Sequence, residues 1–207
     1  MADDHAHYYQ PCEGHGLTHD PFNAIVGPRP IGWISSVSAA GVRNLAPYSF
    51  FNAFNYTPPI VGFSSIGWKD SVANIKETGA FVWNLATRAL AEPMNVTSAT
   101  VDGEVDEFEL SGLTPAPSRL VAPARVLESP VNFECRLTQL IQLQGANGAA
   151  APAWLVLGEV VAVHIDPALI RDGVYDTAAA RPILRAGRMG DYAEIRPDAM
   201  FEMKRPR

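Results

Sequence analysis

The sequence is poor in cysteine and in basic residues. Only two cysteines, Cys12 and Cys135, occur among its 207 residues, so no framework of disulfides is expected. The 16 Lys and Arg residues are outnumbered by 22 Asp and Glu, which gives a formal net charge of −6. A protein that binds nucleic acid through its phosphates needs a basic face. We therefore expect no nucleic-acid partner.

The sequence also has no long apolar run, and no signal peptide is expected at its start. No stretch reaches the roughly 18 apolar residues that a membrane-spanning helix needs. The first residues, MADDHAHYY, carry acids where a signal peptide carries basic residues, and no apolar segment follows them. The histidines near the N-terminus and Cys12 match no zinc-binding spacing. We expect a cytoplasmic protein with no membrane partner and no metal site.

Glycine and proline, by contrast, are spread along the chain, with 16 and 17 residues. This composition favours many short strands joined by turns over a helix bundle. Strands are predicted at 31–37, 43–54, 60–64, 81–85, 131–143 and 154–165, and helices at 71–79, 88–97 and 106–110. We expect a mainly β fold, a closed or nearly closed antiparallel barrel of about six strands with a few short helices. One domain at 21–195 would follow an irregular arm at 1–20 and precede a tail at 196–207.

The two longest predicted strands differ in their pattern. In 131–143 apolar and polar residues alternate from Val131 onward, as in a strand with one buried face. Segment 154–165 is apolar on both faces except at Glu159 and His164. A strand of that kind is buried on both sides. We therefore expect a core on one side of it and a subunit interface on the other.

The densest set of polar groups lies in residues 44–71. It comprises NLAPYSFFNAF, then YTPPIVGFSS, then GWKDS, so hydroxyl and amide side chains stand among aromatics. Pro47 indicates an edge or a bulge in its strand. Asp70 or Ser71 is predicted to cap a helix that ends at Gly79.

Such a run has the groups that flavin mononucleotide (FMN) requires. A helix N-terminus with hydroxyls and Lys69 would neutralise a phosphate. Residues 44–47 and 49–52 would supply backbone and amide groups to the edge of a flat ring. Spacing alone favours a simpler interpretation, in which 69–71 is an ordinary helix cap and the aromatics belong to the core.

The order of longer motifs adds a resemblance to a known family. The matching stretches are HGLTHDPFNAIVGPRPIGWISSVSAAGVRNLAPYSFFNAF, PPIVGFSS, KDSVANIKETGAFVWNLAT, VDEFELSGLTP, ESPVNFECRL and LVLGEVVAVHID. They run in order across about residues 14–166. With them the chain resembles the flavin reductase-like family, which has the FMN-binding split-barrel fold and includes NAD(P)H:flavin oxidoreductases and flavoredoxins.

The resemblance implies a homodimer of six-stranded antiparallel split barrels with FMN bound near the dimer interface. The residues that it assigns to the cofactor are Asn44, Ala46, Pro47, Ser49 and Asn52 around the flavin ring and ribityl chain, and Ser64, Ser65, Lys69, Asp70 and Ser71 around the ribityl chain and phosphate. A segment near the C-terminus, RPILRAGRMGDYAEI, resembles a family segment with an arginine, and Arg185 is the matching position. His19, in the HDPF turn, is a candidate for the nicotinamide pocket.

The flavin would carry the chemistry, because the sequence shows no convincing Ser-His-Asp set or pair of carboxylates. No Gly-x-Gly-x-x-Gly follows a predicted strand, so NADH or NADPH would have to stack directly on the flavin. The leading hypothesis is an NAD(P)H-dependent flavin reductase that serves a free flavin or a partner monooxygenase. The alternatives are a flavoredoxin-type electron carrier with tightly bound FMN and a non-enzymatic flavin-binding module.

Overall fold

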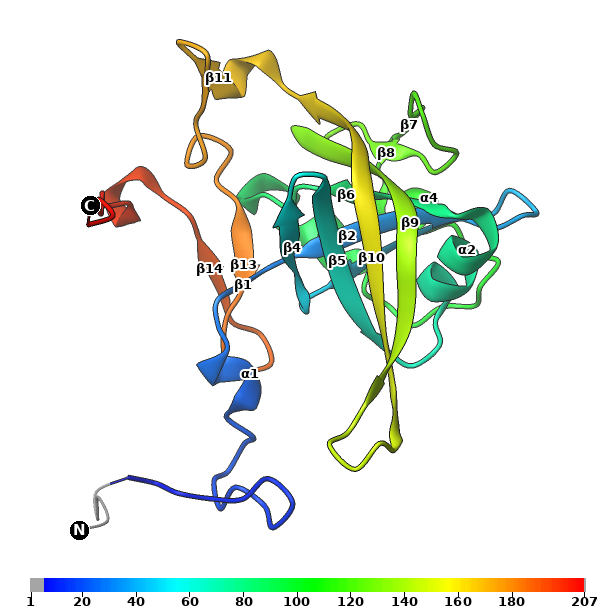
Figure 1. Cartoon of the computed structure of the whole chain (residues 1–207). Helices are drawn as coiled ribbons and strands as arrows, with labels where there is room; N and C mark the ends of the chain where they lie inside the picture. Colours follow the sequence, from blue (N-terminus) through cyan, green and yellow to red (C-terminus); the bar gives the residue numbers. More distant parts are fainter. Residues whose placement is uncertain (1–5, 207) are drawn as a thin grey trace.

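The computed structural model describes residues 6–206 and is built around one large antiparallel sheet (Figure 1). Seven strands lie in it in the order β3-β2-β6-β9-β10-β5-β4. Their bounds are β2 (Gly32–Val37), β3 (Arg43–Tyr48), β4 (Phe51–Tyr56), β5 (Pro59–Ile66), β6 (Ala80–Asn84), β9 (Val131–Gln144) and β10 (Ala150–Ile165). β9 and β10 form the long hairpin that projects from the sheet in Figure 1.

The two edge strands of this sheet follow one another in the chain. β3 ends at Tyr48 and β4 begins at Phe51, so only Ser49 and Phe50 connect them. Neighbouring strands lie about 4.8 Å apart, and a connection this short cannot cross a flat sheet. The sheet therefore curls until its edges approach, although β3 and β4 do not pair with each other. This is the predicted split barrel.

The edge-to-edge connection corrects one sequence prediction. The prediction of a single strand over 43–54 is wrong. The pairing of β3 with β2 ends at Tyr48, and after Ser49 and Phe50 the chain pairs with β5 at the opposite edge of the sheet as β4. Pro47 lies in edge strand β3, as expected for a residue that has no N–H to donate.

The helices are short and lie outside the ladder. They are α1 (Phe22–Ile25), α2 (Asp70–Thr78), α3 (Ala91–Val96) and α4 (Glu107–Ser111). The continuous helix expected over 88–97 is wrong, since Arg88–Leu90 forms a separate 3₁₀ turn before α3. Pro93 consequently lies in the first turn of α3, where a missing N–H costs no intrahelical bond.

Smaller elements complete the chain. β1 (Arg29–Pro30), β13 (Ile183–Arg185) and β14 (Tyr192–Glu194) form a three-stranded sheet, and β7 (Pro115–Ala116) pairs with β8 (Arg125–Val126). β11 (Ile170–Arg171) pairs with β12 (Val174–Tyr175), and further 3₁₀ turns occur at Pro167–Leu169 and Pro197–Ala199. In Figure 1 the strands from β11 to β14 and the C-terminal residues lie beside the barrel.

Two apolar clusters hold the sheet in shape. Phe63, Phe81 and Ile75 belong to the first, which fills the barrel. Trp33 and Phe108 belong to the second, which lies under α3 and α4. Because Ile75 of α2 packs into the first cluster, the start of α2 is fixed beside β3. Burial of these large side chains is the main source of stability.

At the start of β9 the polar face is buried as well as the apolar face, at Asn132 and Glu134, which the alternation in the sequence did not indicate. Arg136 and Thr138, further along the same face, are exposed. Glu134 is fully buried under a loop that covers it. Its carboxylate accepts hydrogen bonds from the backbone N–H groups of Arg119 and Leu120 in that loop, which compensate for the loss of water. His164 Nε2 lies 2.6 Å from Glu134 Oε1. This contact with a buried carboxylate gives His164 a structural role at the end of β10.

Candidate functional site

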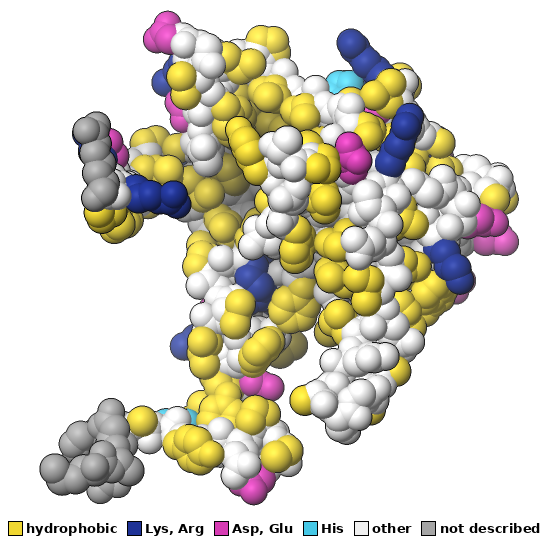
Figure 2. Space-filling view, viewed as in Figure 1, with side chains coloured by type: hydrophobic (Ala, Val, Ile, Leu, Met, Phe, Trp, Pro, Cys, Tyr) yellow, Lys and Arg dark blue, Asp and Glu magenta, His cyan; other side chains and the backbone are white. Residues whose placement is uncertain are grey.

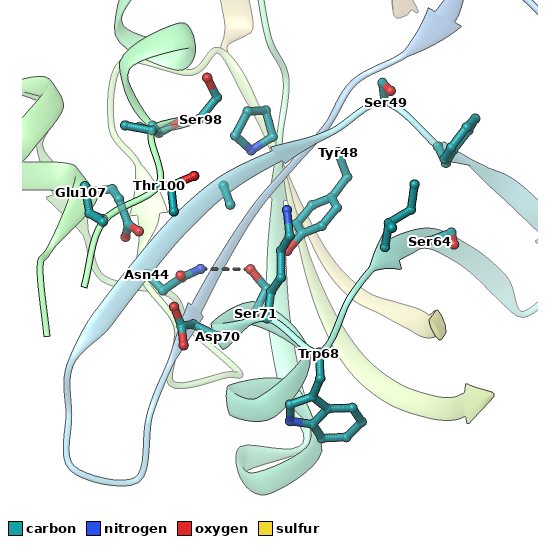
Figure 3. Close-up of a pocket in the computed structure, with 18 of the residues that line it drawn as sticks. Asn44, Tyr48, Ser49, Ser64, Trp68, Asp70, Ser71, Ser98, Thr100 and Glu107 are labelled. Carbon is teal, nitrogen blue, oxygen red and sulfur yellow. Dashed lines mark hydrogen bonds between the residues drawn. The ribbon is translucent and has the colours of Figure 1, made fainter. Parts of the chain in front are cut away.

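A cavity of about 490 Å³ opens where β3, the end of β5 and the start of α2 meet (Figure 3). A volume of this size suits a small-molecule site. Eight of the predicted cofactor residues line it: Asn44, Ala46, Pro47, Ser49, Ser64, Lys69, Asp70 and Ser71. They are brought together because β3 ends at the barrel split, directly beside the first turn of α2.

Four other predicted residues do not line this cavity. Asn52 is exposed on β4, and its side chain accepts a hydrogen bond from Ala53 N–H. Ser65 is fully buried and donates to Gly67 O at 3.0 Å. The guanidinium of Arg185 lies over the ring of Tyr192 and donates to Asp191 O. His19 is exposed in the N-terminal arm.

Helix α2 presents its N-terminus to the cavity. Its N-cap is Lys69, in extended conformation, and not Asp70 or Ser71 as the sequence suggested. The Lys69 side chain makes no capping hydrogen bond, and Val72 N–H donates to Lys69 O at 2.9 Å. Within residues 6–206 the N–H groups of Asp70 and Ser71, at the very start of the helix, are therefore left for a ligand. The other end agrees with the prediction, because Gly79 closes the helix in the left-handed conformation at φ 74°.

Buried polar groups form a chain behind this helix start. Asn44 Nδ2 donates to Ser71 Oγ at 2.9 Å and to Ser36 Oγ at 3.4 Å. Ser36 Oγ also accepts from Asn74 Nδ2 at 3.3 Å. Ser71 and Ser36 are each only 1% exposed. The side chain of Ser71 is therefore held in place at the cavity wall (Figure 3).

Tyr48 contributes a hydroxyl to the same region, although its sequence context indicated only a core aromatic. Among the described residues its hydroxyl is the one buried side-chain polar atom without a hydrogen-bond partner. Burial raises the pKa of Tyr48, and the nearby hydroxyls of Ser71 and Ser65 offset part of that rise. A buried polar group normally has a partner, so this orphaned hydroxyl in the wall suits a cavity that holds a polar ligand.

Glu107 is an acidic residue of the wall that sequence reasoning missed. It comes from α4, and its Oε2 accepts from Leu45 N–H at 2.9 Å. Burial raises the pKa of Glu107, and the negative charges of Asp70 and Asp106 raise it further. Asp106 itself caps α4 by accepting from Phe108 N–H and pairs with Arg43 at 2.6 Å. Lys69 is the only cation among the lining residues.

A hydroxyl-rich loop after α3 was also missed. Ser98 and Thr100 line the cavity opposite α2 and come from the segment TSAT at 97–100. The cluster of hydroxyls was the only signal in the sequence, and nothing local places it near Ser71. Trp68 is half-exposed at the rim, in edge contact with Trp154 at 5.2 Å between ring centroids.

The arrangement can hold an anion at one end and a flat apolar group at the other. First-turn N–H groups, hydroxyls and an ammonium are the donors that a phosphate prefers. Ala46, Pro47 and Phe50 give the opposite end an apolar wall at the barrel split. The residues present therefore fit FMN. No group of three or more His, Cys, Asp or Glu side chains within 6–206 could hold a metal ion.

Fold and site together define a split barrel with a cofactor-sized cavity, and comparison with known proteins identifies its family. Residues 27–183 match the model of the flavin reductase like domain, so the chain belongs to this family. An uncharacterized protein of Halalkalibacterium halodurans is 35% identical over 187 residues, which cover 86% of each chain.

Two solved structures are similar throughout. Nitrilotriacetate monooxygenase component B from Bacillus cereus has a TM-score of 0.81 at 31% identity, covering 88% of this chain and 90% of that one. A protein of Shewanella frigidimarina NCIMB 400, described as having a split barrel domain, has a TM-score of 0.79 at 25% identity, covering 89% and 90%. Within the described residues, no helix has the length and apolar character needed to cross a membrane.

Proposed function

We propose that this protein is an FMN-dependent oxidoreductase that takes hydride from NADH or NADPH and passes the electrons to a free flavin or a partner monooxygenase. The observation that carries the proposal is the cavity in which an uncapped helix N-terminus meets the split of the barrel. Family membership supports it. So does the similarity to a component B, a name that itself implies a companion component.

Each end of the cavity has a role in this proposal. Ser64, Lys69 and Ser71 would hold the ribityl chain and phosphate, with Asp70 orienting donors and not touching the phosphate. Ala46, Pro47 and Ser49 would line the ring. Asn52, Ser65 and Arg185 stay outside this assignment, since none of them lines the cavity.

The flavin, when bound, supplies the hydride-accepting ring, and the side chains bind and orient it. Glu107 is a wall carboxyl group whose pKa is raised by burial, and it accepts from Leu45 N–H, so this carboxylate oxygen is already engaged away from the ligand. A nicotinamide would have to reach the ring of the bound flavin from the open side of this cavity. No catalytic side chain is assigned.

A homodimer forms part of the proposal. Apolar side chains lie on the surface of β4, β5 and β10 (Figure 2), and Val163 of β10 is 52% exposed. A second, almost wholly apolar cavity of about 310 Å³ lies between the barrel and β13. Exposed apolar surface of this kind marks an interaction site. Light scattering after size exclusion should give about twice the monomer mass of 22.4 kDa.

Anaerobic reduction tests the proposed function. The purified protein, loaded with FMN, is mixed with NADH or NADPH while the flavin absorbance is followed. Bleaching by either nucleotide, faster than for free FMN, is the expected result. Stoichiometric FMN that neither nucleotide reduces would favour the electron carrier. A protein without affinity for FMN would refute the proposal.

A further inference from the structure

The hydroxyl of Ser71 has one proton to donate and two positions at which to accept. Asn44 Nδ2 fills one acceptor position at 2.9 Å. The second hydrogen of the same amide points to Ser36 Oγ at 3.4 Å, which also receives Asn74 Nδ2. Both amide hydrogens of Asn44 are thus in use, and its nitrogen faces Ser71.

Tyr48 is the other group at this point. Its hydroxyl has no hydrogen-bond partner within residues 6–206, and it lies close to the hydroxyls of Ser71 and Ser65. Ser65 already donates to Gly67 O at 3.0 Å and is fully buried. A change in the torsion angles of the Tyr48 side chain would allow the phenolic O–H, the unused donor at this point, to donate to the second acceptor position of Ser71 (Figure 3). The residue is only 7% exposed, so water does not readily replace such a bond.

We propose that Asn44 and Tyr48 are positioning residues that fill both acceptor positions of Ser71 Oγ, so that its only proton is directed to an anionic oxygen of the ligand. Resting on the proposed function, this oxygen belongs to the phosphate of FMN. The assignment changes the role of Asn44, which acts through Ser71 and does not contact the flavin ring. It also makes Tyr48, two residues away from the flavin wall at Ala46, a determinant of phosphate affinity.

Directed donation has a consequence for ligand choice. A ligand atom facing Ser71 must be an acceptor, and a charged acceptor gains most. Riboflavin, which has the same ring and ribityl chain but no phosphate, would not use this hydrogen bond. Removal of the Tyr48 hydroxyl should therefore weaken FMN binding and leave riboflavin binding unchanged.

A double-mutant cycle on flavin affinity tests the relay. Dissociation constants for FMN and riboflavin are measured by flavin fluorescence for wild type, Tyr48→Phe, Ser71→Ala and the double variant. Ser71→Ala should weaken FMN binding about 10- to 100-fold, the range for a charge-assisted hydrogen bond. Tyr48→Phe should weaken it several-fold in the wild-type background and leave it unchanged in the Ser71→Ala background.

Two further variants serve as controls for the double-mutant cycle. Tyr8→Phe removes an exposed hydroxyl in the N-terminal arm and should change neither constant. Asn44→Asp replaces the amide donor by a carboxylate of the same shape, to which the Ser71 hydroxyl would donate in place of the ligand. This variant should therefore weaken FMN binding more in the wild-type background than in the Ser71→Ala background. Circular dichroism confirms that each variant is folded.

The outcomes separate the two proposals. Equal losses from Tyr48→Phe in both backgrounds, or an equal loss for riboflavin, would overturn the relay while FMN binding stands. If wild type binds no FMN, the proposed function fails, and the same cycle is measured with inorganic phosphate by thermal shift. Phosphate stabilisation that depends on Tyr48 only when Ser71 is present would then support the relay, and its absence would overturn it.

Discussion

The buried carboxylate of Glu134 is predicted to hold the loop at 117–124, between β7 and β8, onto the barrel. Three donors converge on it: Arg119 N–H at 2.8 Å, Leu120 N–H at 2.6 Å and His164 Nε2 at 2.6 Å. Glu134→Gln keeps the shape but removes the charge and turns an NH₂ group toward one of these donors. One donor then loses its acceptor, and the new NH₂ group is buried without one.

The magnitude follows from the contacts. A hydrogen bond to a charged group contributes about 1.5–3 kcal/mol, and a buried unsatisfied donor costs about 1–3 kcal/mol. Breaking a buried pair costs about 3–5 kcal/mol in measured cases. We expect Glu134→Gln to lower the free energy of unfolding by about 3 kcal/mol, which for a domain of this size lowers Tm by roughly 6–12 °C.

Urea denaturation followed by tryptophan fluorescence measures this change. Glu104→Gln, a change of the same kind at an exposed position, should alter the free energy of unfolding by less than about 0.5 kcal/mol. If the Glu134 and Glu104 variants unfold at the same urea concentration, the three hydrogen bonds do not hold the loop and the reasoning is wrong.

The pH dependence gives an independent check. Burial raises the pKa of Glu134, but the hydrogen bonds from Arg119, His164 and Leu120 together outweigh it, so the pKa is lowered overall. The stabilisation is therefore present above the pKa of an unfolded glutamate, about 4.3, and is lost as the pH falls through the folded value. The difference between wild type and Glu134→Gln should be constant above about pH 5 and shrink below about pH 4. A difference that stays constant as the pH falls from about 5 to about 2 would contradict this account.

Two further predictions concern the cavity. Lys69→Ala should weaken FMN binding about 10-fold or more and reduce the salt dependence of that binding, as measured by fluorescence titration at two ionic strengths. Lys204→Ala, in the exposed tail, should change neither the affinity nor its salt dependence. Equal effects of the two variants would refute the assignment of Lys69. Glu107→Gln keeps an acceptor for Leu45 N–H but removes a buried charge. The pKa of Glu107 is raised in the folded state, so the stabilisation of the folded state by the protonated carboxyl is lost as the pH rises through that pKa. The variant should therefore have a higher Tm than wild type at pH 8, but not at pH 4. A variant that melts below wild type equally at both pH values would contradict this.

How far the site can be predicted depends on how local its signals are. Lys69, Asp70 and Ser71 are adjacent, and a helix start can be recognised from a few residues. Ser98 is 27 residues away from Ser71 in the sequence, and Thr100 and Glu107 are further away still. They reach the cavity only because α3 and α4 pack on the sheet. Tyr48 has the same sequence context whether its hydroxyl is partnered or not.

The sequence alone determined most strands of the large sheet and the end of α2, and it limited the strand that contains Pro47 to an edge or a bulge. Alternation of side chains, the left-handed conformation that Gly79 accepts and the missing N–H of Pro47 are properties of single residues and their neighbours. Only the tertiary structure decided that 43–54 divides between opposite edges of the sheet, that Glu134 is buried and that Asn44 faces Ser71. Each of these features depends on contacts between segments that are distant in the sequence. Those contacts form only when the whole sheet curls into a barrel, so no short stretch of sequence specifies them.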